Sequence, residues 1–346
     1  MRDGRKGFGR RMRLAAEALF AFALPAIVCF GGCGGIQAYR LEADGGKTYA
    51  DSGTSQKGGE MRQEAGGLRQ TEDGCMEPTG SLQLAGSSSM EKLTDALAEC
   101  FMERYPGITV TVQFTGSSAG IESVLRGSAD IAITSRELSE EEKASGLTGY
   151  AVALDGIAVC VDSGNPVTEI TWQQLRDIYT GKITNWSSIG GGDMPVVLIG
   201  REAGSGTREA FEELLGIRGR CTYANELDST GAVMARVAST PGAVGYLSFD
   251  VLHPAAEPAE WKGAKGRGSD GGGRVCAIAL DGIAPTAENV RDGKYPLCRP
   301  FLMVIRGELS AQRDIVRLWL RYAYSAEGQD IAEKVGLVKK AAGKGE

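Results

Sequence analysis

The residues best suited to chemistry lie in one short stretch, 201–207, whose sequence is Arg-Glu-Ala-Gly-Ser-Gly-Thr. An apolar run at 195–199 precedes it and predicts a buried strand, and a helical pattern with Phe211 on its apolar face follows it. A helix N-terminus offers unpaired N–H groups, glycines let the backbone approach a ligand, and arginine adds a planar charged donor. The stretch therefore suits a tetrahedral oxyanion, although an ordinary turn with Thr207 as helix cap explains it equally well.

The same local arrangement occurs three times, because a strand runs into a Gly/Ser/Thr turn that opens a helix at 86–89, 116–120 and 204–207. In an open α/β sheet such turns lie at the carboxyl ends of the strands, where ligands bind. Three convergent helix N-termini favour an anion site over simple helix capping.

Strands and helices alternate along most of the chain, which predicts an α/β fold with a largely parallel sheet. The expected strands are 81–85, 108–114, 130–133, 156–161, 195–199, 242–247, 275–280 and 300–305. The expected helices end near 105, 126 and 179, begin near 139 and 207, and close the chain at 316–324 and 328–335. Capping-box spacing marks Ser88–Glu91, Ser139–Glu142 and Thr171–Gln174 as helix starts.

The N-terminus has the pattern of a targeting signal. A basic segment precedes an apolar run at 18–30 that is too short to span a bilayer, and the sequence Phe-Gly-Gly-Cys ends at Cys33. This ending resembles a lipoprotein signal-peptidase site, so residues 1–32 are expected to be a signal peptide and Cys33 the lipidated residue, which predicts a membrane anchor carrying palmitate. A plain secretory signal cut nearby is the alternative, and both place the mature chain outside the cytoplasm. Residues 33–78, rich in Gly, Ser and Gln, predict a flexible tether.

Charge and cysteine content exclude several function classes. The formal net charge is −6, and removing 1–32 takes away six basic and two acidic residues, which leaves −10. Such a chain is a poor candidate for nucleic-acid binding. Cysteines occur without a CxxC pair, so neither zinc nor thioredoxin chemistry is expected. Six cysteines beyond Cys33 allow 15 disulfide connectivities, and Cys100 and Cys160 lie in apolar segments that suit buried free thiols.

Taken together, these segments resemble the phosphate-binding proteins of bacterial high-affinity phosphate ABC transporters. The segments that carry the resemblance are 86–89, 115–120, 130–136, 153–159, 180–186, 201–207, 241–246 and 328–331. They cover most of 81–338 in the family's order, while 1–78 and the loop near 254–273 fall outside it.

The resemblance implies a two-lobed type II periplasmic-binding-protein fold, the Venus flytrap, with two mixed sheets flanked by helices. Lobe 1 would comprise 79–160 and 300–346, lobe 2 would comprise 161–299, and the two-strand hinge would lie near 159–162 and 300–304. The implied protein is a monomer that binds inorganic phosphate and passes it to ABC permease subunits. It needs no cofactor or metal and is not an enzyme.

The resemblance also implies the ligands. The phosphate would be bound by Ser88, Ser89, Ser117, Ser135, Arg201, Ser205, Gly206 and Thr207. Many family members have an aspartate after the third strand, where it accepts a hydrogen bond from protonated phosphate and so rejects sulfate. Here Ser135 and Arg136 occupy that place. Arg136 is expected to supply a second cation or to pair with Asp155 or Asp130, and Asp155 is the candidate acceptor.

Other functions fit the residues less well. A serine hydrolase with Ser205 or Ser88 as nucleophile needs a histidine base, and the chain has one histidine, His253, in a Pro-flanked loop. No G-x-S-x-G elbow surrounds Ser205, and no lysine follows the Gly-Ser-Gly-Thr turn as a P-loop requires. A receptor for sulfate, molybdate or tungstate is the main alternative, and a structural or adhesion lipoprotein is a further one.

Overall fold

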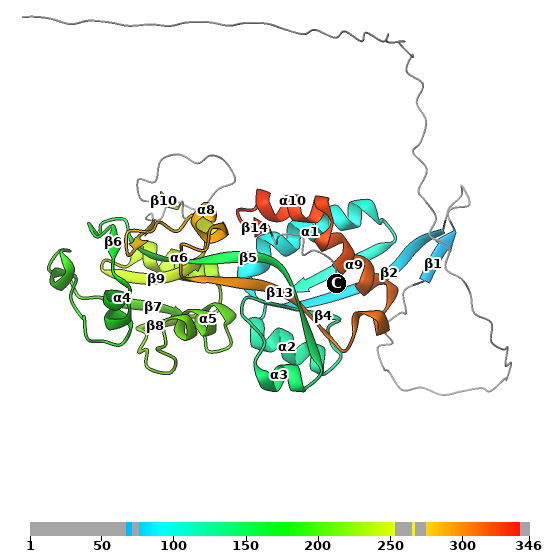
Figure 1. The fold of residues 1–346 in the computed structure, drawn as a ribbon, viewed down its shortest axis with the longest axis horizontal. Coiled ribbons are helices and arrows are strands. Elements are labelled where there is room, and N and C mark those ends of the chain that lie inside the picture. Colours follow the sequence, from blue (N-terminus) through cyan, green and yellow to red (C-terminus); the bar gives the residue numbers. More distant parts are fainter. Residues whose placement is uncertain (1–66, 71–75, 253–264, 267–274, 340–346) are drawn as a thin grey trace, which may run out of the picture. The chain divides into compact units, whose positions relative to one another are not determined.

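The computed structural model describes residues 67–70, 76–252, 265–266 and 275–339 (Figure 1). The expected signal peptide, the lipidation site Cys33, His253 and most of the 254–273 loop lie outside these residues. In the expected tether, residues 67–70 pair antiparallel with 76–79, so part of that range is strand. This pairing depends on backbone hydrogen bonds and needs no apolar periodicity, which is why composition alone did not predict it.

Strands and helices alternate within the described part of the chain. The strands are β1 (Gly67–Gln70), β2 (Met76–Gly86), β3 (Ile108–Gln113), β4 (Ile131–Thr134), β5 (Leu147–Asp162), β6 (Glu169–Ile170), β7 (Val197–Arg201), β8 (Asn225–Leu227), β9 (Ala243–Ser248), β10 (Lys265–Gly266), β11 (Val275–Ala277), β12 (Ala279–Leu280), β13 (Cys298–Arg306) and β14 (Val338–Lys339). The α-helices are α1 (Glu91–Arg104), α2 (Ser117–Leu125), α3 (Glu140–Ala144), α4 (Trp172–Tyr179), α5 (Gly206–Leu214), α6 (Thr230–Ser239), α7 (Phe249–Leu252), α8 (Ala287–Arg291), α9 (Asp314–Tyr324) and α10 (Ala326–Lys334). The short 3₁₀ helices are η1 (Ser88–Met90), η2 (Trp186–Ile189) and η3 (Leu309–Ala311).

Most expected elements are present, but one capping box and one strand differ from the expectation. The capping boxes at Ser139–Glu142 and Thr171–Gln174 are confirmed, whereas the one expected at Ser88–Glu91 is wrong. There the chain first makes η1, which Ser87 caps, so α1 begins one turn later without a side-chain cap. The strand expected at 275–280 is split into β11 and β12, since β11 pairs with β5 while β12 pairs with β6.

The main sheet is continuous rather than divided into the two sheets expected. Its strand order is β1-β2-β4-β13-β5-β9-β7-β8, with further strands paired at the sides. Pairing is parallel among β2, β3 and β4 and among β7, β8 and β9, but antiparallel where β13 and β5 join these groups. The long strand β5 belongs to both groups, so hydrogen bonds connect the two expected sheets.

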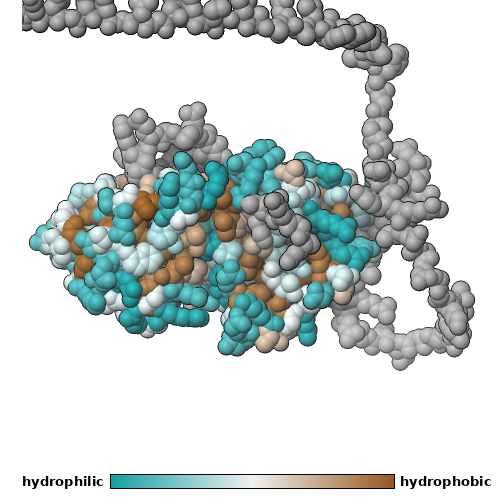
Figure 2. Space-filling model, viewed as in Figure 1, coloured by the Kyte–Doolittle hydropathy of each residue, from teal (hydrophilic) through white to brown (hydrophobic). Residues whose placement is uncertain are grey.

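Two large apolar cores lie along this sheet and define two lobes, and a smaller third cluster packs α2 against the sheet of lobe 1. Lobe 1 is the set of elements around Leu82, Phe101 and Trp319, and lobe 2 is the set around Trp186, Phe211 and Tyr246. On the face shown in Figure 2, hydrophobic residues form scattered patches between hydrophilic ones. Within the described residues, no helix has the length and apolarity that crossing a membrane requires.

Strands β5 and β13 run through both lobes (Figure 1). Strand β5 contributes Val152 to the first core and Ile157 to the second, so it passes between the cores several residues before the expected hinge near 159–162. At this point Asp155 and Arg299 lie opposite each other on the paired strands. Arg299 donates to Asp155 Oδ2 from Nε at 3.0 Å and from Nη2 at 2.8 Å, and both side chains are at most 1% exposed. Burial raises the pKa of Asp155 and lowers the pKa of Arg299, and their hydrogen bonds oppose both shifts.

Helix α2 lies so close to β2 that only glycine fits at position 120. A Cβ there would stand 2.4 Å from the carbonyl oxygen of Ala85 and 2.6 Å from Cα of Gly86, and neither backbone atom can move away easily. This contact holds the start of α2 beside the end of β2.

We predict that Gly120→Ala destabilises the fold, because the added methyl overlaps the backbone of β2. The expected loss is about 1–3 kcal/mol in the free energy of unfolding, measured by urea denaturation. The matched control is Gly231→Ala in α6, where an added Cβ meets no described atom within 4 Å. The control should be neutral or slightly stabilising, because alanine favours the helix. Equal midpoints for the two variants would contradict the close packing of α2.

Candidate anion-binding site

The expected site residues lie where parallel strands end. The turn after β2 leads into η1, and the turn after β3 leads into α2. The chain after β4 forms the loop at 135–138, and the turn after β7 leads into α5. The seven candidate side chains among them are all buried, with exposures between 0% and 7%: Ser88, Ser89, Ser117, Ser135, Arg201, Ser205 and Thr207. Buried hydroxyls must be hydrogen-bonded, so their mutual contacts show how the site is held together.

On the lobe 1 side, serine hydroxyls form a connected chain. Ser87 Oγ donates to Ser135 Oγ at 2.8 Å, and Ser87 Oγ also accepts from the N–H of Ser89 at 3.2 Å. The N–H of Ser135 donates to Ser117 Oγ at 3.3 Å. These bonds bring the ends of β2 and β4 and the first residue of α2 to one place.

On the lobe 2 side, the first turn of α5 faces these serines. A Cβ at Gly206 would stand 2.3 Å from Ser117 Oγ and 2.9 Å from Ser135 Oγ, so glycine is needed for this close approach. Ser205 caps the helix by accepting from the N–H of Arg208, and Thr207 follows at the second helical position. The first turn of α5, where helix N–H groups have no intrahelical partner, therefore lies next to the lobe 1 hydroxyls.

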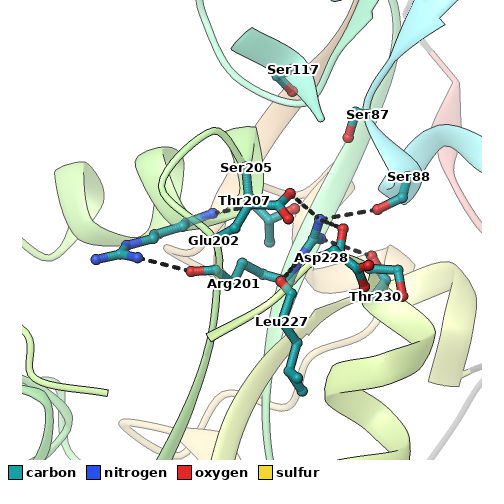
Figure 3. Close-up of polar contacts among 12 residues, drawn as sticks. Ser87, Ser88, Ser117, Arg201, Glu202, Ser205, Thr207, Leu227, Asp228 and Thr230 are labelled. Carbon is teal, nitrogen blue, oxygen red and sulfur yellow. Dashed lines mark hydrogen bonds and ion pairs between the residues drawn. The ribbon is translucent and has the colours of Figure 1, made fainter. Parts of the chain in front are cut away.

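Arg201 at the end of β7 is held mainly by neutral acceptors. Its Nε donates to the carbonyl of Leu227 at 3.2 Å and its Nη2 to the carbonyl of Asp228 at 2.8 Å. Its Nη1 donates to Thr230 Oγ1 at 3.2 Å (Figure 3). Neutral partners fix the guanidinium in place without cancelling its charge, which stays available for an anion.

The same guanidinium touches the other lobe and one carboxylate. Its Nη2 lies 3.1 Å from Ser88 Oγ and 3.4 Å from Glu202 Oε1 (Figure 3). Burial lowers the pKa of Arg201, although the charge of Glu202 works in the opposite direction. Arginine side chains stay protonated in proteins, so this guanidinium is a cation at neutral pH.

Hydroxyl contacts also cross between the lobes. Ser89 Oγ lies 2.7 Å from Thr207 Oγ1 and 3.2 Å from Thr230 Oγ1. With the Arg201–Ser88 contact and the close approach of Gly206 to Ser117, these distances bring all the expected ligand residues into one cluster.

Arg136 does not have the partners expected for it. Both its Nη atoms donate to the carboxylate of Glu142 at 2.8 Å, and its Nε lies 2.8 Å from Glu209 Oε2. The expected pairing with Asp155 or Asp130 is therefore wrong, since Asp130 pairs with Arg313 at 2.6 Å. With two carboxylates around it, Arg136 is not a spare cation for the anion.

Asp155, the candidate proton-sensing acceptor, is occupied elsewhere. Its Oδ2 accepts both bonds from Arg299, and its Oδ1 accepts from the N–H of Phe249 at 3.2 Å. Arg299 also donates to the carbonyl of Ser135 at 3.2 Å. Asp155 therefore helps to position the Ser135 turn through Arg299. Both of its carboxylate oxygens already accept hydrogen bonds, so its geometry does not favour direct contact with an anion.

Three residues at the site were not predicted. Ser87 and Thr230 complete the hydroxyl network, and Glu202 is the carboxylate beside Arg201, with a pKa that burial raises. One signal could have found Thr230: Ser229 caps α6, so Ser229, Thr230 and Gly231 repeat the strand–turn–helix arrangement a fourth time. The contact of Glu202 has no comparable sequence signal.

Comparison with known proteins agrees with this geometry. The model of the PBP superfamily domain matches residues 70–327. The phosphate-binding protein PstS of Bacillus subtilis is 34% identical over 223 residues, which is 63% of this chain and 68% of that protein. A structure of a phosphate ABC transporter substrate-binding protein with bound phosphate from Clostridium perfringens is 35% identical, with a TM-score of 0.67, and covers 76% of this chain and 100% of that one. An ABC-type phosphate transport receptor from Vibrio cholerae is 30% identical, with a TM-score of 0.60, and covers 75% and 100%.

The expected two-lobed type II periplasmic-binding-protein fold is thereby confirmed. The chain belongs to the PBP superfamily and is a PstS-like member of it.

Proposed function

We propose that this chain is an extracytoplasmic receptor that binds inorganic phosphate between its lobes and delivers it to an ABC transporter permease. The observation that carries the proposal is the single buried cluster in which Arg201 and hydroxyls from both lobes meet. Related proteins named as phosphate-binding receptors support the choice of ion.

The chemistry of the cluster suits a dehydrated phosphate. Hydroxyl and backbone N–H donors can replace the water around the ion, and charge-assisted bonds from Arg201 offset part of its desolvation. The proposed ligands are Ser88, Ser89, Ser117, Ser135, Arg201, Ser205, Gly206 and Thr207.

Binding would couple to a hinge motion between the lobes. We assign lobe 1 to 79–156 and 300–337 and lobe 2 to the described residues of 157–299, with β5 and β13 as the connection. The lobe boundary expected at residue 160 therefore lies a few residues earlier, because 157–160 pack in the core of lobe 2. An ion that contacts both lobes binds the closed form better than the open form, so it shifts the population toward closure. The closed form is the one a permease could distinguish from the empty receptor.

We also propose that the chain is a receptor rather than a hydrolase. The Ser205 hydroxyl accepts from the N–H of Arg208 as a helix cap. The hydroxyls around it belong to serines and threonines, none of which has the basicity needed to activate a serine. The chain would act as a monomer, held at the membrane by lipid on Cys33.

We predict that calorimetry will show phosphate binding with a Kd of about 1 μM or tighter and sulfate binding at least roughly 100-fold weaker. Molybdate and tungstate should be titrated in parallel. Absence of phosphate binding, or tighter binding of one of the other oxyanions, would refute the assignment of the ion.

Arg201→Ala is expected to weaken phosphate binding by about 2.7 kcal/mol, roughly 100-fold in Kd, because bonds to a desolvated charge are lost. The matched control is Arg126→Ala, whose side chain is 74% exposed and pairs with Glu122 on the surface of α2. Circular dichroism should confirm that both variants fold. Equal affinity of the two variants would place the anion elsewhere.

Cys33→Ala is expected to release the mature chain from the membrane fraction, because the lipid-carrying thiol is absent. The check is fractionation of cells followed by immunoblotting, with labelling by an alkyne-tagged palmitate analogue. Cys29→Ala, inside the expected signal, is the control and should leave the chain anchored. Retention of the Cys33 variant on the membrane would contradict lipid attachment at this residue.

A further inference from the structure

Arg136 lies in a cage of carboxylates beside the proposed phosphate site. Its two terminal nitrogens bind the two oxygens of Glu142 at 2.8 Å each. Glu142 is itself fixed, because its carboxylate also accepts from the N–H of Ser139 in the capping box of α3. These groups all belong to lobe 1, so the guanidinium is held in one orientation before lobe 2 contributes.

The third nitrogen of Arg136 reaches lobe 2. Its Nε lies 2.8 Å from Oε2 of Glu209, which is in the first turn of α5. The other oxygen of Glu209 accepts from Ser118 Oγ at 3.0 Å, and the N–H of Ser118 donates to the carbonyl of Gly204 at 3.2 Å. The first turn of α5 is thus joined to the loop after β4 by one ion pair and to the N-terminus of α2 by two hydrogen bonds.

This ion pair differs from an ordinary surface pair. The side chains of Arg136 and Glu209 are 8% and 19% exposed, so water and salt screen them less than exposed charges. Burial alone would lower the pKa of Arg136, but the hydrogen bond with Glu142 and the charge of Glu209 raise it overall. Glu209 Oε2 also lies 3.7 Å from Nη2 of Arg218, whose side chain is 70% exposed. Separating Glu209 from Arg136 therefore leaves this partly buried carboxylate with only a longer, solvent-screened ion pair.

Both partners are adjacent to proposed ligands. Arg136 directly follows Ser135, and Glu209 lies two residues after Thr207 on the same helical turn. Arg208, next to Glu209, donates from Nη1 to the carbonyl of Arg201 at 2.9 Å. Movement of the Arg136–Glu209 pair would therefore shift proposed ligands in both lobes.

We propose that Arg136 and Glu209 form an interlobe latch, which positions the Ser135 turn against α5 and slows the release of bound phosphate. The inference rests on the proposed function for its ligand. The latch resists reopening of the closed form, because opening of the lobes must separate the pair. It therefore acts mainly on the dissociation rate rather than on the encounter rate.

The test is stopped-flow kinetics of phosphate with the purified full chain and Glu209→Gln, which keeps the side-chain size and removes the charge. We expect dissociation to be about tenfold faster and association to change less than about twofold. The control is Glu103→Gln in α1, which removes the same charge from an exposed position and should leave both rates close to those of the original chain. Raising NaCl should speed dissociation from the original chain more than from Glu209→Gln. Equal dissociation rates for the two variants would overturn the latch.

A second readout needs no ligand. Small-angle scattering of the phosphate-free chain should show a larger radius of gyration for Glu209→Gln than for Glu103→Gln, because the open form gains population. If the original chain does not bind phosphate, the proposed function is refuted. The scattering comparison still tests whether the Arg136–Glu209 pair holds the lobes together. Should Glu209→Gln fail to fold, Ser118→Ala removes one bond to Glu209 and is expected to increase the radius of gyration by a smaller amount. Unchanged dimensions in the folded variants would overturn the proposal.

Discussion

The antiparallel pairing of β5 with β13 is the interaction on which the rest of the structure depends. These two strands supply residues to both apolar cores, so they keep the lobes in a defined relation while the chain crosses from one to the other. At the crossing, Asp155 and Arg299 form a buried ion pair whose charges satisfy each other. Arg299 also donates to the carbonyl of Ser135, which connects the crossing strands directly to the turn that carries this proposed ligand. The position of one proposed ligand is therefore set by the same pair that stabilises the crossing.

The site concentrates positive potential in a chain whose net charge is −6. Helix N-termini from both lobes converge there, and Arg201 is buried among carbonyls and hydroxyls that leave its charge uncompensated except by Glu202. Carboxylates are nevertheless close to the site. Glu142 and Glu209 both pair with Arg136, and the pair with Glu209 joins the two lobes. The two arginines thus have different environments: neutral acceptors surround the one proposed to bind the anion, and acidic side chains surround the one that joins the lobes.

Much of the fold followed from local patterns, because alternation, apolar runs and Gly/Ser/Thr turns are properties of short segments. The ends of β2, β4 and β7 were predicted to within one or two residues, and the helices that Ser139 and Thr171 cap were predicted at their starts. Errors occurred where the answer depended on distant partners. The strand at 275–280 divides because its halves pair with different strands, and the two expected sheets are one because β5 extends through both.

The sequence by itself predicted which residues suit an oxyanion, since donors at helix starts are encoded in a few neighbouring residues such as 204–207. It also indicated the two-lobed family through the order of those segments. Only the tertiary structure decided the partners of long charged side chains. Arg136 pairs with Glu142 and Glu209 rather than with an aspartate, and Asp155 pairs with Arg299, because strand register and helix packing bring together residues far apart in the chain. Charge pairing depends on distances in space, which no local pattern along the chain specifies.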